Sequence, residues 1–452
     1  MLIGGACSSG GSTPAVSSST TDTTSSTSSP TSTAPSSVRP ASRWPTYHGT
    51  NDRRGSVPGL ATPRSLSRAW SHSVDGAVYG QPIVVGSTVI AATENNTVYG
   101  LDFTTGRPVW QRHLGTPASL SSLPCGNIDP LGITGTPAYD SVTGSVFVVA
   151  ETTGGSHALF ALDPATGAVR FSRNLDVTNR DRMAEQERGA LAVANGRVYV
   201  PFGGLFGDCG NYVGYVVSLA TTGKGAITHY EVPTAREAGI WAASGPAISE
   251  SGDVFVSVGN GASSSGPYDD SDSVLRLSPD LSQRLDFFAP TDWAAQNASD
   301  ADLGSTGPLL VPNHLALIAG KAGEIFLLDS NHLGGIGGQL AVTTGCTSFG
   351  GMAYDAGAAF LPCTDGVQRV DIVGQTLVKR WKVSTNGSPV VGGGAVWTLD
   401  QSGGALDEFD EASGKPITSA PVGPLTRFAS PVLVGTRVLV GTTNAVVAFT
   451  VH

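Results

Sequence analysis

Residues 80–110 read GQPIVVGSTVIAATENNTVYGLDFTTGRPVW. This stretch opens on Gly-x-Pro, continues through short apolar segments separated by polar turns, and ends in a Thr-Gly turn followed by Val-Trp. Apolar segments of this length between Gly, Asn and Asp turns are typical of antiparallel hairpins. The unit recurs to the C-terminus about every 47 residues, a period that indicates a repeat architecture. Later copies open near Gly135, Gly189, Gly245, Gly307, Gly350, Gly387 and Ser430.

The two ends of the repeat region complement each other. The last copy stops after Val446-Val-Ala-Phe449, one strand short, while Leu66-Ser-Arg-Ala-Trp70, upstream of the first copy, reads as a final strand. A chain that lends its first strand to its last repeat closes a ring and leaves no open sheet edge. We therefore predict an all-β fold, a single eight-bladed β-propeller of four-stranded antiparallel blades over residues 44–452. Seven blades is the alternative, because the copies from Gly350 and Gly387 match the unit least well.

The composition agrees with this fold and excludes several others. Of 452 residues, 59 are Gly and 28 are Pro, and 14% are charged, which excludes a coiled coil or helical bundle. The net charge is −10 without a Lys/Arg cluster, so we expect no nucleic-acid partner and no binding to an anionic membrane surface. No apolar run reaches the roughly 18 residues that span a bilayer. We expect a monomer that contacts the membrane only through an N-terminal lipid anchor.

The N-terminus indicates export. Residues 1–7 (MLIGGAC) are apolar and end at Cys7, and residues 8–43 are rich in Ser and Thr, which we interpret as a disordered tether. This order resembles the end of a bacterial lipoprotein signal and implies that Cys7 becomes the lipidated first residue. The alternatives are an ordinary secretion signal cut at Ala6 or a terminus without a signal. The first two place the chain outside the cytoplasm, lipid-anchored or secreted.

The remaining cysteines suggest disulfides. Cys125, Cys209, Cys346 and Cys363 are even in number, as expected for an exported protein, and their spacings fit no zinc site. Three pairings are possible. We favour Cys346–Cys363, which are close enough to join neighbouring strands, and Cys125–Cys209, whose flanking residues are both typical of loops. Four free buried thiols are the alternative.

The repeat resembles a known family. Its tail, apolar-x-apolar-Asp-x-x-Thr-Gly-x-x-x-Trp, is similar to the tryptophan-docking repeat of pyrroloquinoline-quinone (PQQ) propellers. The resemblance covers roughly residues 44–452 and includes the segments 44–50, 54–55, 125–130, 132–137, 239–241, 259–261 and 300–304. This superfamily holds quinoprotein alcohol dehydrogenases and also scaffold and assembly lipoproteins without a cofactor. The resemblance therefore implies the fold more strongly than it implies an activity.

Four residues match the positions that contact the quinone or the substrate in the dehydrogenases. The resemblance implies that Trp241 stacks on PQQ, that Asp300 or Asp302 is the catalytic base, and that Lys321 hydrogen-bonds the quinone oxygens. A nearby carboxylate is needed to take the alcohol proton. Each residue also has a structural explanation. Trp241 could pack a blade, the two aspartates could cap a loop or short helix, and Lys321 could be a solvated hairpin lysine.

The predicted metal ligands match the family less well. The resemblance implies that Asn260 in Gly259-Asn-Gly261 binds Ca²⁺, an ion that takes hard oxygen ligands. The alternative is that Asn260 occupies a turn. The expected Glu ligand has no clear counterpart, and Asp208 is the nearest carboxylate. The adjacent cysteine pair that covers the cofactor in many relatives is missing. We interpret the acidic loop 269–272 as a solvated turn.

Two functions follow from these observations. The first is an extracytoplasmic, membrane-tethered PQQ-like propeller without a cofactor, acting as a binding or scaffold module. Its axial face would take a protein, a glycan or a cell-wall ligand. The alternative is a PQQ- and Ca²⁺-dependent dehydrogenase that oxidises an alcohol, a polyol or a sugar.

Overall fold

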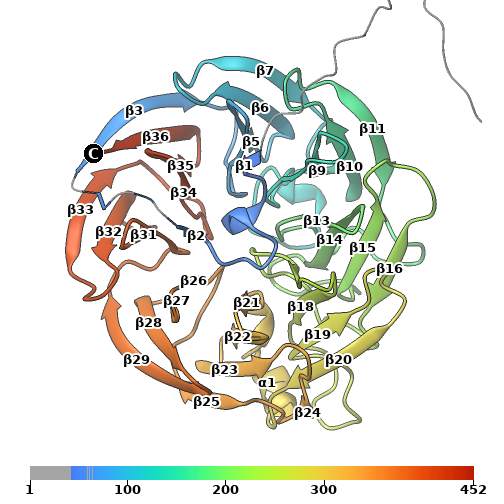
Figure 1. Ribbon diagram of the computed structural model, residues 1–452. Helices are drawn as coiled ribbons and strands as arrows, with labels where there is room; N and C mark the ends of the chain where they lie inside the picture. Colours follow the sequence, from blue (N-terminus) through green and yellow to red (C-terminus); the bar gives the residue numbers. More distant parts are fainter. Residues whose placement is uncertain (1–41, 59, 61, 64) are drawn as a thin grey trace, which may run out of the picture. The chain divides into compact units, whose positions relative to one another are not determined.

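The computed structural model describes residues 42–452 apart from 59, 61 and 64. In this part of the chain, eight β-sheets are arranged as the blades of a ring, each with a core of four antiparallel strands (Figure 1). This arrangement confirms the eight-bladed β-propeller and rejects the seven-bladed alternative. The predicted segment 1–7 with Cys7, and all of the predicted tether except Ser42 and Arg43, lie outside the described residues.

The first four blades follow one another along the chain. Blade 1 contains β4 (Ile83–Val85), β5 (Thr88–Ala92), β6 (Thr97–Asp102) and β7 (Pro108–His113). Blade 2 contains β8 (Ala138–Asp140), β9 (Ser145–Thr152), β10 (Ser156–Leu162) and β11 (Val169–Asn174). Blade 3 contains β13 (Ala192–Ala194), β14 (Arg197–Gly204), β15 (Tyr215–Ala220) and β16 (Thr228–Glu231). Blade 4 contains β17 (Ala247–Ile248), β18 (Val254–Val258), β19 (Ser273–Leu277) and β20 (Arg284–Ala289).

The other four blades complete the ring. Blade 5 contains β21 (Leu309–Val311), β22 (Leu315–Ala319), β23 (Glu324–Asp329) and β25 (Ala341–Thr344). Blade 6 contains β26 (Ala353–Asp355), β27 (Ala358–Cys363), β28 (Gly366–Val373) and β29 (Thr376–Val383). Blade 7 contains β30 (Val390–Gly392), β31 (Ala395–Asp400), β32 (Ala405–Asp410) and β33 (Pro416–Pro421). Blade 8 contains β34 (Val432–Val434), β35 (Arg437–Gly441), β36 (Ala445–Val451) and β3 (Leu66–Ser73).

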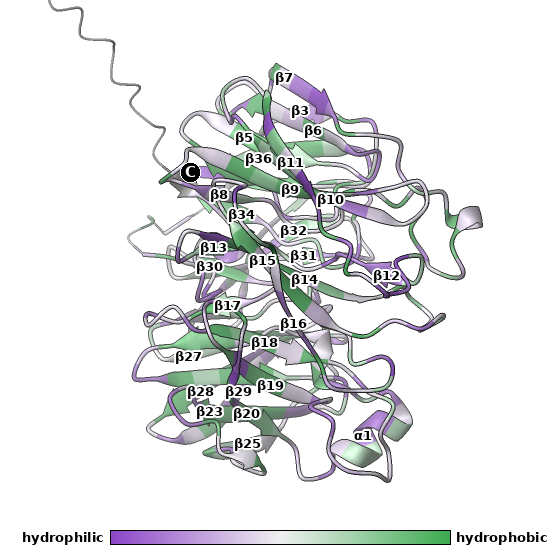
Figure 2. Ribbon diagram, turned by 90° about the vertical axis from the view of Figure 1, so that its right-hand side faces the viewer, coloured by the Kyte–Doolittle hydropathy of each residue, from purple (hydrophilic) through white to green (hydrophobic). Residues whose placement is uncertain are grey.

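A few short elements supplement the blades. The added strands are β1 (Ser42–Trp44), β2 (Ser56–Val57), β12 (Glu185–Gln186) and β24 (Gly335–Ile336). The helical elements are α1 (Trp293–Ser299), η1 (Tyr47–Gly49), η2 (Leu120–Ser122) and η3 (Leu303–Ser305). α1 and β12 project on the same face of the ring (Figure 2). Within the described residues, no helix has the length and hydrophobicity needed to cross a bilayer.

The ring closes as predicted from the two ends of the repeat region. β3 pairs antiparallel with β36, in a register that places Leu66 opposite Val451 and Ser73 opposite Ala445. The N-terminal strand is therefore the outermost strand of the last blade, and this pairing covers the edge that β36 would otherwise expose.

The repeat tail explains how neighbouring blades pack. The Trp110 indole donates a hydrogen bond to the carbonyl of Pro164 in the next blade at 2.9 Å. Its ring lies against Gly167, where an added Cβ would come within 2.3 Å of the ring and where φ is +65°. Trp70 lies in the same way against Gly106. The Thr-Gly turn thus requires glycine for its positive φ and for contact with the tryptophan.

Burial follows the position of each strand in its blade. Every residue of β5 is buried, whereas in the outermost strand β7 only Trp110 is buried. In Figure 2, hydrophobic residues gather on strands inside the blades, such as β9 and β27, and β7 ends in hydrophilic residues. The cores therefore lie between neighbouring blades, and the outer strands face solvent.

Residues 44–57, which we call the axial strap, cross the ring at its axis (Figure 1). Backbone amides from the innermost strands of five blades donate hydrogen bonds to strap carbonyls at 2.8–3.1 Å, and these amides belong to Tyr139, Ile248, Leu310, Tyr354 and Val391. Strap residues Asn51 and Asp52 also share a cleft with the turns that join the first and second strands of blades 4 and 5. The strap thus closes the end of the axis at which these turns lie.

Both predicted disulfides are present, Cys125–Cys209 and Cys346–Cys363. The first joins the loop before β8 to the loop between β14 and β15, and the second lies within blade 6 and the segment that leads into it. The four cysteines outside the N-terminal segment are thus paired rather than free.

Candidate functional site

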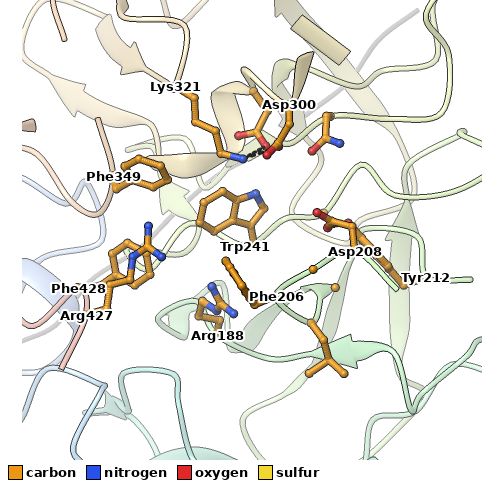
Figure 3. A pocket seen from close by; sticks show the side chains of 16 residues that line it. Arg188, Phe206, Asp208, Tyr212, Trp241, Asp300, Lys321, Phe349, Arg427 and Phe428 are labelled. Atoms are coloured by element: carbon orange, nitrogen blue, oxygen red, sulfur yellow. Dashed lines mark hydrogen bonds and ion pairs between the residues drawn. The ribbon is translucent and has the colours of Figure 1, made fainter. Parts of the chain in front are cut away.

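A cavity of about 340 Å³ lies at the axis (Figure 3). Residues of blades 3 to 6 and blade 8 line this cavity. They lie in the segments that lead into the innermost strands and in the loops between the second and third strands of the blades. In an antiparallel blade, these segments and loops lie at one end of the strands, and the turn between the first and second strands lies at the other. Since the axial strap lies beside such turns, the cavity and the strap occupy opposite ends of the axis. All six residues predicted from the family resemblance line the cavity: Asp208, Trp241, Asn260, Asp300, Asp302 and Lys321.

Trp241 lies at the centre of the lining side chains in Figure 3. Its indole packs against the backbone of Gly259 and Gly304. A side chain at either position would crowd the indole, because a Cβ added to Gly259 would lie 3.1 Å from Nε1 of Trp241 and one added to Gly304 would lie 2.9 Å from it. The rings of Phe349 and Phe428 have centroids 6.3 and 6.5 Å from the Trp241 ring. The tryptophan therefore forms a flat aromatic floor with two further rings beside it.

Lys321 connects the two aspartates that were predicted as catalytic bases. Its Nζ lies 2.5 Å from Oδ1 of Asp300 and 3.1 Å from Oδ2 of Asp302, and 5.4 Å from the ring centroid of Trp241. Asp300 is exposed and caps the C-terminus of α1 with a left-handed backbone, as the structural alternative for this residue anticipated. Asp302 is 1% exposed, and burial raises its pKa to about 6, with the Lys321 charge acting in the opposite direction.

A second carboxyl lies behind Asp302. Asp272 is fully buried, and burial followed by the nearby charge of Asp302 raises its pKa to about 8. Its Oδ1 accepts a hydrogen bond from the amide of Leu303 at 3.3 Å. The interpretation of loop 269–272 as a solvated turn is therefore wrong for residues 270–272, because Asp270 and Ser271 are also buried. The loop folds inward against the segment that carries Asp302.

The two predicted metal ligands are hydrogen-bonded to protein groups. Asn260 donates from Nδ2 to Oε2 of Glu237 at 3.3 Å. Tyr212 donates from its hydroxyl to Oδ1 of Asp208 at 2.6 Å. The nearby carboxylates of Asp300 and Asp302 face the Lys321 ammonium.

This set of donors does not fit Ca²⁺. The ion takes six to eight oxygen ligands in a cage, but the described residues contain no group of three or more His, Cys, Asp or Glu arranged to hold a metal ion. The carboxylates of Asp300 and Asp302, which could add oxygen ligands, pair instead with the Lys321 ammonium. We therefore derive no step through a metal ion.

Two arginines that line the cavity were missed from the sequence. The guanidinium of Arg188 lies 5.9 Å from the Trp241 ring centroid, and that of Arg427 lies 5.1 Å from the centroids of both Phe349 and Phe428. Burial lowers the pKa of Arg188 to about 10, and the charge of Arg427 is the next cause. Arg188 and Phe349 come directly before a repeat opening, and Arg427 three residues before one. That position in each copy is the signal that could have found them.

The disulfide Cys125–Cys209 supports one wall of the cavity. Cys209 follows Asp208 in the loop 205–212, and Leu205 of this loop packs with Leu123, Ile128 and other residues of the loop 118–131. The two loops therefore hold each other, and the first of them carries Asp208 and the exposed Phe206 to the cavity mouth.

Comparisons with known proteins agree with this architecture. The family described as outer membrane protein assembly factor BamB matches residues 66–204. A quinohemoprotein alcohol dehydrogenase from Comamonas testosteroni has 16% identity and a TM-score of 0.72, over 90% of this chain and 80% of that chain. A europium-containing methanol dehydrogenase has 14% identity and a TM-score of 0.72, over 91% of this chain and 98% of that chain. BamB from Moraxella catarrhalis has 18% identity and a TM-score of 0.58, over 85% of this chain and 98% of that chain.

The comparison with curated proteins gave no match. At these identities the solved structures show the shared fold, which carries both the assembly factor and the dehydrogenases and does not choose between their functions. The repeat tail, the ring closure and these similarities lead to one conclusion: the chain is an eight-bladed β-propeller whose fold is similar to that of BamB and of the two dehydrogenases.

Proposed function

We propose that this chain is an extracytoplasmic binding module that captures a ligand in its axial cavity, either membrane-anchored through a lipidated Cys7 or secreted. One observation carries the proposal: aromatic rings and charged side chains converge on an open cavity at one end of the axis, while the axial strap closes the other. Concave sites with aromatic lining and a few convergent polar groups are the usual form of small-ligand sites. The two disulfides support an oxidising compartment.

The size of the cavity favours one of the partner classes expected from the sequence. A cavity of about 340 Å³ has the size of a small-molecule site, whereas a stable protein interface buries about 800 Å² on each partner. The flat indole of Trp241 suits the apolar face of a sugar ring, and the polar groups around it suit hydroxyl groups. A glycan or a cell-wall fragment therefore agrees best with this cavity.

A dehydrogenase of an alcohol, polyol or sugar is the second candidate, favoured by the convergence of Trp241, Asp302 and Lys321. In this case the indole would stack on PQQ and the ammonium of Lys321 would contact its oxygens. Bound PQQ would supply the two-electron acceptor. Asp302, buried and with its pKa raised to about 6, would take the proton of the substrate hydroxyl.

Thermal unfolding and tryptophan fluorescence of the full chain distinguish the two candidates. The chain is measured alone, with PQQ, with PQQ plus Ca²⁺, and with a saccharide. A ligand at 100 times its Kd raises the free energy of unfolding by about 2.7 kcal/mol. Reduction of an electron-accepting dye in the presence of PQQ and an alcohol, polyol or sugar would establish the dehydrogenase. Saccharide binding without dye reduction under any of these conditions would establish the binding module.

A tryptophan variant shows whether the cavity is the site of binding. Trp241→Leu removes the floor, so we expect at least tenfold weaker binding, a loss of about 1.4 kcal/mol or more. The matched control is Trp293→Leu, which removes a tryptophan of α1 that does not line the cavity. If both variants bind the ligand equally well, the axial cavity is not the binding site.

A further inference from the structure

We propose that the axial cavity binds an acidic oligosaccharide, with Arg188 and Arg427 holding a sugar carboxylate and the next sugar unit entering a second cavity behind Phe349 and Phe428. This inference rests on the proposed binding function and names its ligand class. We call the two arginines the arginine subsite. It lies on the opposite side of Trp241 from Lys321 in Figure 3 and is distinct from the lysine–aspartate group.

The first observation is that the arginine subsite lacks acidic partners. Arg170, Arg180 and Arg276 each form an ion pair with an aspartate or glutamate. Among the described residues, neither Arg188 nor Arg427 forms such a pair. Arg188 donates to the amide oxygen of Gln186 at 2.6 Å, and its buried Nε has no acceptor.

Arg188 is partly exposed and Arg427 is exposed, and burial followed by the charge of Arg427 lowers the pKa of Arg188. The two acidic groups that act on Arg188, Glu94 and Asp208, form no ion pair with it among the described residues. A bound carboxylate would offset the repulsion between the two arginines, because a guanidinium donates two parallel hydrogen bonds to a carboxylate. Three basic and three acidic side chains line the whole cavity, so the positive charge is confined to the arginine subsite.

The second observation is the aromatic floor next to these arginines. Trp241, Phe349 and Phe428 lie with ring centroids 6.3–6.5 Å apart. A pyranose ring presents C–H groups on its faces and hydroxyl groups at its edge. With its face on Trp241, its edge would meet Asn260 and Asp208 on one side and the arginine subsite on the other. This arrangement suits a sugar with a carboxylate.

The third observation is a neighbouring cavity of about 190 Å³. It shares Phe349, Arg427 and Phe428 with the axial cavity, and its remaining lining includes Thr364, Asn386 and Gln401. These hydroxyl and amide groups can donate to and accept from sugar hydroxyls. Arg427 therefore stands at the junction of two cavities, each of which can hold one ring. An aromatic acid would place no hydroxyl groups in the polar second cavity, whereas a saccharide of at least two units would, so the saccharide fits the two cavities better.

Calorimetric titration of the full chain with digalacturonate tests the proposal. Its methyl ester is the matched neutral probe, since it has the same rings without the charges. We expect digalacturonate to bind at least tenfold more tightly than the ester, and the difference to shrink as salt is raised. We also expect digalacturonate to bind more tightly than galacturonate.

Two variants assign this binding to the proposed subsites. Arg427→Gln should weaken digalacturonate binding at least tenfold and ester binding by a smaller factor, while Arg107→Gln, at an exposed arginine of blade 1, should change neither. Gln401→Ala should weaken digalacturonate binding and leave galacturonate binding unchanged, because Gln401 lines only the second cavity.

The outcomes separate this inference from the proposed function. Equal binding of acid and ester would overturn the arginine subsite while the binding module stands. Binding of PQQ with no binding of any saccharide would overturn the ligand class. If neither PQQ nor a saccharide alters the protein, both the inference and the proposed binding function are contradicted.

Discussion

The two ends of the propeller axis hold their arginines in different ways. At the strap end, Arg53 is 1% exposed, and its guanidinium donates four hydrogen bonds to oxygens of Thr46, Tyr47, Leu191 and Pro246 at 2.8–3.2 Å. At the cavity end, Arg188 is partly exposed with one such acceptor, and Arg427 is exposed with none among the described residues. A buried cation whose donors are satisfied fixes a structure, whereas donors left free at a cavity are available to a ligand.

The same contrast holds for the backbone and the carboxyls. Strap carbonyls accept hydrogen bonds from five blades, so the chain itself fills that end. At the other end, Asp272 and Asp302 are buried with raised pKa values, and Oδ2 of Asp272 has no hydrogen-bond partner. The strap end therefore contributes to stability, and the cavity end holds buried carboxyl groups at a cost in stability.

The largest expected effect comes from breaking the satisfied end. Arg53→Met keeps most of the side-chain volume but removes four hydrogen bonds. The carbonyls of Tyr47 and Pro246 lose their donor, whereas the carbonyl of Leu191 keeps a hydrogen bond from the Thr46 hydroxyl. At about 1 kcal/mol for each carbonyl left without a donor, we expect a loss of about 2 kcal/mol in the free energy of unfolding.

Arg54→Met is the control, because Arg54 is partly exposed and pairs with Asp52 at the surface, where such pairs contribute under about 1 kcal/mol. Equal destabilisation by both variants in urea unfolding would mean that the strap end is not specially stabilised.

The next effect is a gain of stability at the cavity end that depends on pH. Burial and the charge of Asp302 raise the pKa of Asp272 in the folded chain to about 8. At pH values between the pKa of Asp272 in the unfolded chain and about 8, the folded chain therefore binds more protons than the unfolded chain. Stability from this group is thus fully present at low pH and is lost as the pH rises through 8. Asp272→Asn removes the titration and keeps an oxygen for the amide of Leu303. We expect the variant to be more stable than the parent by about 1 kcal/mol or more at pH 8.5, and equally stable near pH 4.

Urea unfolding at both pH values provides the measurement, with Asp300→Asn as the control. Asp300 is exposed, so its replacement should change stability little at either pH. A destabilised Asp272→Asn at pH 8.5 would show that the carboxylate is stabilised by the fold, and the contrast between the two ends of the axis would then fail.

Much of the fold, and the convergence of several residues on one cavity, could be predicted from the sequence, for a physical reason. The repeat fixes every copy's turns and strands locally, so the period, the missing last strand and the segment around Trp70 together define the ring. Because each copy opens at the axis, residues at similar positions of different copies meet there. This explains why Trp241, Asp302 and Lys321, which are far apart in the chain, line one cavity.

The remainder depends on contacts that the repeat does not encode. Asp272 belongs to an acidic loop whose composition is typical of a solvated turn, and its burial follows from the way the loop packs against the segment after α1. Arg188 and Arg427 are ordinary charged residues in loops. Their significance comes from the absence of an ion-pair partner among the described residues, and which loops become neighbours is decided by the closed ring.

The smallest expected effect is at the cavity mouth and sharpens the distinction between fold and site. Phe206 is 53% exposed although it is a large apolar residue, and it lines the cavity. Since the folded chain buries little of this ring, Phe206→Ala should change the free energy of unfolding by no more than about 0.5 kcal/mol. A ligand in the cavity would cover part of the ring, so its loss should weaken binding two- to fivefold, or by about 0.5–1 kcal/mol. Val142→Ala, at an exposed valine of the β8–β9 turn, should change neither quantity. If Phe206→Ala lowers stability and leaves ligand affinity unchanged, Phe206 serves the fold and the mouth of the binding site lies elsewhere.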